Sequence, residues 1–169
     1  MNLQEEKPMV TFGPHVEEVD PFVSPFYISL LLHDYTLHNC MLDSGVAHNL
    51  MPLFVMKELN LYISKPYRDL YSFDSKMVKC IGLIKDVAVS LAQIPEKSIV
   101  MDVVVVDIPT RFGMLLSRSW GEKLGGVLKL GFTYAIIQVF NGEKRRLYRE
   151  TRFVKTTSKK YVGNSPIYS

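Results

Sequence analysis

Apolar residues occur along the chain in short, β-prone runs, and these runs predict strands. Residues 26–32 and 35–42 form two such runs, separated by His33 and Asp34, which together predict a tight β-hairpin. The second predicted strand runs directly into Asp43. The pattern therefore places a carboxylate at the end of an apolar strand.

Three more segments have the composition of strands. Residues 81–91 and 98–106 are rich in Val and Ile, and Gly82 predicts a bulge or a close approach of another segment. Residues 127–147 predict a closing hairpin, because apolar residues alternate through its first half and Asn141-Gly142 is a typical type I′ turn pair.

Two short helical segments interrupt the strands. Residues 52–59 begin with Pro52 and have apolar residues at helical spacing, and we expect Asn60 to end this helix. Residues 120–124 predict a second helix, which the glycines at 125 and 126 would close. The predicted fold is mainly β: a closed, single-lobed barrel with one or two short helices.

Length and composition suit one domain with tails. Of the 169 residues, 47% are hydrophobic and 22% are charged. We assign residues 1–21 to a flexible linker, 22–152 to the domain and 153–169 to a C-terminal linker. The longest apolar run, 100–106, has a strand's length, and the N-terminus has no apolar signal segment. We therefore expect an intracellular, cytoplasmic protein with no membrane partner.

The net charge of +3 is too small to predict a nucleic-acid partner. The positive charges gather late in the chain, at Lys144, Arg145, Arg146, Arg149, Arg152, Lys155, Lys159 and Lys160. This clustering favours a solvated strand face and tail, with an RNA-binding tail as the alternative. We do not expect nucleic acid as a partner of the domain.

The cysteines and histidines do not have the spacing of a metal site. Cys40 and Cys80 lie in apolar stretches, so we expect buried free thiols. His33 and His38 lie at or beside the predicted turn, and no carboxylate or thiol is spaced to complete a ligand set. We therefore expect neither a metal nor a cofactor.

Asp43, Ser44 and Gly45 form the candidate chemical centre. An ionised carboxylate after an apolar strand is costly unless its surroundings satisfy or use it. Ser44 adds a short donor and acceptor, and Gly45 permits a tight turn. One chemistry that needs this set is aspartic proteolysis, in which two neighbouring carboxylates share a proton. The alternative is an ordinary turn, where the same tripeptide is common.

Two other segments bear on this centre. Residues 113–117 and the helix after them repeat its order of apolar strand, small-residue turn and helix. Residues 65–79 are polar and aromatic, and Asp74 and Ser75 predict a hairpin turn within them. This hairpin is either a lid over a peptide cleft or a plain surface hairpin, and the sequence leaves both open.

Three segments together resemble retropepsins of gypsy-type long-terminal-repeat retrotransposons, particularly those of plants. The first is Leu42-Asp43-Ser44-Gly45-Val46-Ala47-His48-Asn49-Leu50-Met51-Pro52, which is similar to their active-site segment. Residues 73–82 resemble the flap and the strand after it, and residues 114–120 resemble the second signature, which precedes the C-terminal helix. The segments occur in the family's order, and the resemblance implies a retropepsin-like barrel.

The resemblance implies an aspartic endopeptidase that works as a homodimer and processes a retroelement polyprotein, which binds as an extended peptide. It assigns catalysis to Asp43, Ser44 and Gly45, and substrate binding to Val46, Ala47, Phe73, Asp74, Ser75 and Lys76. In the family, the residue at Ser44 grips its symmetry mate beneath the dyad. The residues support a dimer independently, because Asp43 is the only Asp followed by Ser or Thr and then Gly. The second carboxylate must therefore come from a second copy.

Two residues depart from the family pattern. Val46 stands where the family usually has Ala, and its bulk beside the catalytic loop could perturb the dyad. Ser117 stands where retropepsins usually have Gly. These departures keep open a second hypothesis, a catalytically inactive retropepsin-like domain for dimerisation or peptide binding. A serine hydrolase using Ser44 and His48 is rejected, because no nucleophile-elbow pattern is present, and we expect His48 to hydrogen-bond locally.

Overall fold

The computed structural model of the chain describes residues 10–11, 26–43, 45–73, 76–109, 111–125, 127–128, 133–140, 142–151 and 154–159. Strands dominate these residues, and the helices among them are short. No helix in these ranges is long and apolar enough to span a membrane.

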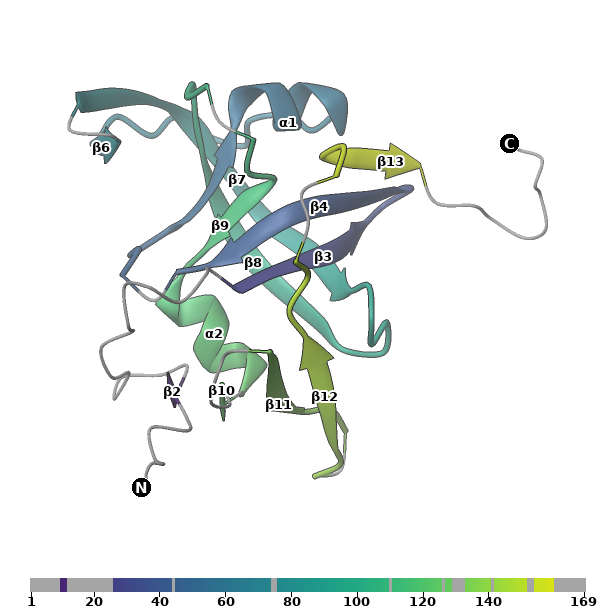
Figure 1. The fold of residues 1–169 in the computed structure, drawn as a ribbon. Helices are drawn as coiled ribbons and strands as arrows, with labels where there is room; N and C mark the ends of the chain where they lie inside the picture. The colour runs from purple at the N-terminus through teal and green to yellow at the C-terminus, as the bar shows by residue number, and fades with distance from the viewer. Residues whose placement is uncertain are drawn as a thin grey trace.

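Six strands close into a barrel (Figure 1). Around the ring they are β4 (Tyr35–Leu42), β3 (Phe26–Leu32), β7 (Lys76–Leu91), β8 (Ser98–Val106), β5 (Asn49–Pro52) and β9 (Met114–Leu116). The β4–β9 and β5–β8 pairs are parallel, and the other pairs of the ring are antiparallel. The predicted closed, mainly β fold with two short helices is confirmed.

Strand β8 shows how the sequence builds two apolar clusters. Residues 98–102 alternate between exposed and buried positions, the period-2 pattern of a half-buried strand. Residues 103–106 are all buried, because both faces of this half are covered. Val103 and Val105 belong to the main core, and Val104 and Val106 belong to a second cluster. Leu50, Cys80, Ile108 and Leu115 complete that second cluster.

Strands β6 (Leu70–Phe73) and β7 pair as a hairpin, and β7 contains the predicted bulge. β6 pairs with the start of β7, with Phe73 opposite Lys76, so the expected turn at residues 74–75 lies outside the described residues. The strand predicted to start at residue 81 starts at Lys76 instead, because the hairpin strand continues through a bulge. The register shift between Cys80 and Gly82 confirms that bulge.

The predicted helices are present with shifted starts. α1 (Leu53–Glu58) begins after Pro52, which is extended and ends β5, and Asn60 follows the helix with a positive φ of 57°. α2 (Arg118–Leu124) begins two residues before its predicted start. The helix starts earlier because the Ser117 side chain caps it by accepting from the backbone N–H of Trp120. The predicted start rested on Trp120, and that residue gives no sign of the cap.

A second sheet has the strand order β12 (Lys144–Tyr148), β11 (Tyr134–Gln138), β10 (Val127–Leu128) and β2 (Val10–Thr11). β10 pairs antiparallel with β11, so the chain reverses between them. The prediction of one alternating strand from residue 128 to 136 is therefore wrong, because alternation does not mark a reversal of direction. β11 and β12 form the predicted hairpin, in which Gly142 has a φ of 75° and Asn141 lies outside the described residues.

The loop between β7 and β8 holds β12 in place. The Gln93 side chain accepts a hydrogen bond from the backbone N–H of Tyr148 (2.8 Å) and donates one to its carbonyl (2.7 Å). Glu96 pairs with Arg145 over 3.0 Å. These contacts join the second sheet to the barrel.

Two short strands lie in segments expected to be linkers. One is β2, and the other is β13 (Thr157–Lys159), which pairs with β4. The Asn39 side chain donates to the carbonyl of Val154 (2.9 Å), and the Thr157 hydroxyl donates to Glu58 (2.7 Å). Described residues beyond 152 are thus bonded to the barrel, and the limits of the domain and its linkers stay predictions.

Candidate active site

Asp43 is fixed by the backbone of two parallel strands. It follows β4, whose last residue, Leu42, pairs with Leu116 of β9. The backbone N–H of Asp43 continues this pairing by donating to the carbonyl of Leu116 (2.9 Å). The two segments that repeat each other in the sequence therefore lie side by side, and Asp43 extends from the end of β4 beside the buried strand β9.

A tight turn holds the carboxylate. Oδ1 of Asp43 accepts a hydrogen bond from the backbone N–H of Gly45 (3.0 Å), and the Asp43 carbonyl accepts one from Val46 (3.0 Å). A Cβ on Gly45 would lie 3.3 Å from Oδ1, tighter than most such contacts. Asp43 is half-buried and Gly45 is exposed. No salt bridge to Asp43 occurs among the residues that the structure describes.

The other loop residues have separate environments. Ser44 lies outside the described residues. Val46 is half-buried and packs against the second apolar cluster, where its added bulk contributes to the core. Its carbonyl accepts a hydrogen bond from the backbone N–H of Arg118 (3.3 Å), which joins the loop to the start of α2. Ala47 is exposed.

Asn49 was not among the predicted site residues, yet it supports the loop from below. Its side-chain oxygen accepts from the backbone N–H of Ser117 (2.9 Å), and its amide nitrogen donates to the carbonyl of Asp102 (3.0 Å). Ser117, buried between β9 and α2, accepts at Oγ from the backbone N–H of Trp120 (3.3 Å). The residue at Ser117 is thus a helix cap, and its φ of −79° does not require glycine.

His48 pairs with Tyr67 rather than with a local group, so that prediction is wrong. The Tyr67 hydroxyl and Nε2 of His48 are 3.2 Å apart, and the rings meet edge to face with centroids 5.9 Å apart. Desolvation, followed by the charge of Asp69, raises the pKa of Tyr67. The contact joins the segment after Asp43 to the segment that leads into β6.

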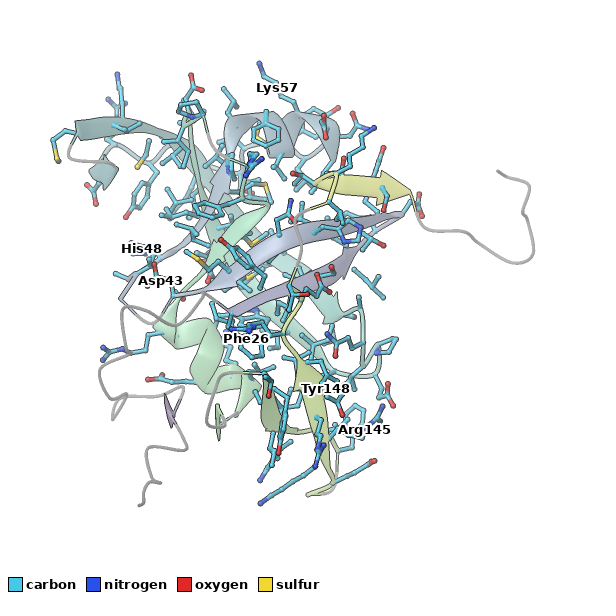
Figure 2. All side chains as sticks on the ribbon, in the orientation of Figure 1. Phe26, Asp43, His48, Lys57, Arg145 and Tyr148 are labelled. Atoms are coloured by element: carbon cyan, nitrogen blue, oxygen red, sulfur yellow. The ribbon has the colours of Figure 1, made fainter. Side chains whose placement is uncertain are left out.

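Two of the predicted substrate-binding residues, Phe73 and Lys76, lie on the β6–β7 hairpin. The backbones of Phe73 and Lys76 pair next to its tip, and Asp74 and Ser75 lie outside the described residues. Figure 1 shows the hairpin extending beyond the barrel, and Figure 2 places the labelled Asp43 and His48 on the same side of that view. The backbone thus has the form of a projecting hairpin.

A cleft of about 460 Å³ adjoins the loop, between residues 47–49, β8 and α2. Its walls are mainly polar and include His48, Asp102 and Lys123. Asp43 is not among the described residues that line it. A single copy of the chain therefore carries its candidate carboxylate outside this cleft.

Both cysteines are buried free thiols, as predicted. Burial raises the pKa of the Cys40 thiol well above its ordinary value, and burial followed by the charge of Asp69 raises that of Cys80. Neither thiol is therefore activated as a nucleophile. Among the described residues, no three His, Cys, Asp or Glu side chains gather as a group that could hold a metal.

Comparison with solved structures gives the fold a name. The chain is similar to the crystal structure of the retroviral protease-like domain of Ddi1 from Leishmania major, with a TM-score of 0.52 and 13% identity. The match covers 74% of this chain and 95% of the other. The chain has a retropepsin-like fold. No protein-family model matches the chain, and no curated protein matches it.

The retropepsin-like fold gives the two sequence signatures a common location. The Asp43 segment follows β4 and the Ser117 segment follows β9, and these strands are parallel neighbours. Residues 114 and 115, read from the sequence as part of the second signature, are buried in β9. The resemblance in fold agrees with the resemblance in sequence motifs.

Proposed function

We propose that this chain is an aspartic endopeptidase that acts as a homodimer, with Asp43 of each copy forming the catalytic dyad. The observation that carries the proposal is the placement of Asp43. Asp43 is half-buried on the turn that follows β4 of a retropepsin-like barrel. Its carboxylate accepts from the backbone N–H of Gly45, and its own backbone N–H donates to the carbonyl of Leu116 in β9, the parallel neighbour of β4. Rigid backbone positioning of this kind is what a catalytic carboxylate needs.

The chemistry would use the two Asp43 carboxylates and one water. Two carboxylates held close together cannot both ionise, so they share a proton. The ionised carboxylate takes a proton from the water as the water attacks the scissile carbonyl. The protonated carboxyl acts as the acid toward that carbonyl, and the leaving amine is protonated as the peptide bond breaks. Activity would therefore favour acidic to neutral pH, because one carboxyl must keep its proton.

The number of candidate carboxylates supports a second copy as the missing partner. One chain supplies one Asp-Ser-Gly, whereas the dyad needs two carboxylates. An isologous dimer would bring two equal loops together across a two-fold axis and enclose a site between them. Ser44 would grip its symmetry mate beneath the dyad, and the backbone around Gly45 would contact the carboxylates and the substrate, as the resemblance implies.

The proposed substrate is an extended peptide from a retroelement polyprotein. The β6–β7 hairpin would cover the peptide through Phe73, Asp74, Ser75 and Lys76, while Val46 and Ala47 would contact it from the loop. Such a peptide binds through strand-like main-chain hydrogen bonds and side-chain pockets. The polyprotein itself follows from the resemblance of the motifs to retrotransposon retropepsins.

The test is cleavage of a flexible peptide library by the wild type and by Asp43→Asn, with and without a statine-type inhibitor. Asp34→Asn is the matched control, since Asp34 is exposed in the turn between β3 and β4. We expect inhibitor-sensitive cleavage that Asp43→Asn abolishes and Asp34→Asn leaves unchanged. A folded wild type that cleaves nothing at acidic or neutral pH would overturn the proposal and favour an inactive domain for dimerisation or peptide binding.

A further inference from the structure

The hairpin of β11 and β12 presents one face with aromatic and basic side chains. Its register places Tyr134 opposite Tyr148, Ile136 opposite Arg146, and Gln138 opposite Lys144. Because opposite residues of a pair share a face, these six form one surface, called here the aromatic-basic face. Lys144, Arg146 and Tyr148 are exposed on it.

The other face of the same hairpin is used for packing. Ala135, Ile137 and Leu147 are buried in the main core. Arg145, the residue next to Arg146, pairs with Glu96 at 3.0 Å and approaches Glu143 at 3.9 Å. The two adjacent arginines of β12 therefore have different surroundings. Arg145 lies near two carboxylates, and Arg146 lies on the aromatic-basic face.

The aromatic rings and the cation form a continuous arrangement. The Arg146 guanidinium lies 4.4 Å from the centroid of the Tyr134 ring, and the Tyr134 and Tyr148 rings are 6.0 Å apart. Tyr148 is 50% exposed, and Phe140, at the tip of the same hairpin, is 61% exposed. Two exposed rings and a planar cation give flat surfaces on which other planar groups can stack.

The charge of this part of the chain differs from the rest. Residues 144–160 contain eight of the 20 lysines and arginines and one of the 17 acidic residues. The remainder of the chain is therefore net acidic, which is why the overall charge of +3 conceals the basic segment. Of the cations in this segment, Lys144 and Arg146 lie on the aromatic-basic face, whose six residues include no carboxylate. A positive face with an exposed aromatic ring is complementary to a polyanion that carries planar bases.

We propose that the aromatic-basic face binds single-stranded nucleic acid. Bases would stack on Tyr148 and on the Arg146–Tyr134 pair, while Arg146 and Lys144 contact phosphates. Stacking requires unpaired bases, so a single strand fits this face better than a duplex. The face lies on the second sheet, whereas Asp43 follows β4 of the barrel (Figure 2), so binding does not depend on catalysis.

The experiment measures fluorescence anisotropy of a labelled 20-nucleotide oligouridine with the full 169-residue chain over a series of salt concentrations. We expect Tyr148→Ala to weaken binding about tenfold and Tyr148→Phe to leave it nearly unchanged, because Phe keeps the stacking ring. Arg146→Gln should weaken binding about fivefold at 0.1 M salt and reduce the salt slope by about 0.7, the effect of one phosphate contact. Arg145→Gln removes the same charge and should have a much smaller effect.

Four results would overturn the proposal. They are no binding at low salt by a folded chain, equal losses in Arg145→Gln and Arg146→Gln, a Tyr148→Ala variant that binds like the wild type, and equal affinity for a duplex of the same length. Loss of self-association in Tyr148→Ala, without oligonucleotide binding by the wild type, would instead identify the face as a contact between copies. Circular dichroism of each variant confirms that the fold is kept.

Discussion

The side-chain oxygen of Asn49 accepts a hydrogen bond from the backbone N–H of Ser117, which lies 68 residues further along the chain. Asn49 also donates to the carbonyl of Asp102, so one buried amide joins β5, β8 and the start of α2. The loop that carries Asp43 lies between β4 and β5, and Asn49 is the first residue of β5. The hydrogen bonds of Asn49 therefore fix the end of this loop. Its geometry therefore depends on a residue that takes no part in the proposed chemistry.

Replacing Asn49 with Ala should remove both hydrogen bonds and leave a buried N–H without its partner. We expect the free energy of unfolding to fall by about 1–3 kcal/mol. Urea denaturation measures this change, with Gln138→Ala, at an exposed position of β11, as the control. A loss no larger than that of the control would contradict the supporting role of Asn49.

The cap at Ser117 predicts an unequal effect of two small substitutions. Ser117→Ala removes the acceptor for the Trp120 N–H and should cost about 1 kcal/mol. Ser117→Gly, which introduces the residue usual in retropepsins, should cost only a few tenths of a kcal/mol, since glycine is tolerated at N-caps. Thermal denaturation of the two variants provides the comparison, and the reverse order would contradict the capping role.

Two glycines with close neighbours predict a second pair of substitutions with unequal effects on stability. A Cβ on Gly113 would collide with the backbone carbonyl of His38, whereas a Cβ on Gly82 would meet the Ile63 side chain, 2.5 Å from Cγ2. A side chain can move aside more easily than a strand backbone. We therefore expect Gly113→Ala to cost about 3 kcal/mol and Gly82→Ala about 1 kcal/mol. Equal costs in urea denaturation would show that the strand backbone can move as easily as the side chain.

The pKa of Asp102 predicts a dependence of stability on pH. Its carboxylate accepts from the backbone N–H of Asp86 (2.9 Å) and lies 3.6 Å from Lys85, and these contacts lower its pKa from the ordinary 3.8. A lowered carboxyl pKa stabilises the fold above the ordinary value, and the contribution is lost as pH falls through the lower, folded-state pKa. The wild type should exceed Asp102→Asn by about 0.5–1 kcal/mol at pH 6, because the pair is exposed.

That difference should shrink as the pH is lowered from about 5 towards 3. Urea denaturation of both proteins across this range measures it. A difference that stayed constant or grew on acidification would show that the carboxylate does not stabilise the folded state through its charge.

Local signals predicted the elements of this fold well. The β3–β4 hairpin, the bulge at Gly82 and the residue that ends α1 each follow from neighbouring residues, and each is present. The reversal between β10 and β11 was missed, because alternation of apolar residues is the same in one strand as in two consecutive strands. The start of α2 was missed because a serine cap has no apolar signal.

The site could be predicted only in part. Asp43 and Gly45 were identified because their chemistry is contained in adjacent residues. Asn49 and Tyr67 were not, since their partners lie 68 and 19 residues away and no local pattern joins them. The aromatic-basic face was also concealed, because only the register of β11 and β12 separates Arg146 from Arg145.

The most direct test of the account is a subunit-mixing experiment. Wild type and Asp43→Asn are unfolded, mixed at constant total concentration and refolded together, and peptide cleavage is measured against the wild-type fraction. If each active site takes one Asp43 from each copy, activity follows the square of that fraction, so an equal mixture retains about one quarter. Activity that falls only in proportion, to about one half, would contradict a dyad shared between two chains.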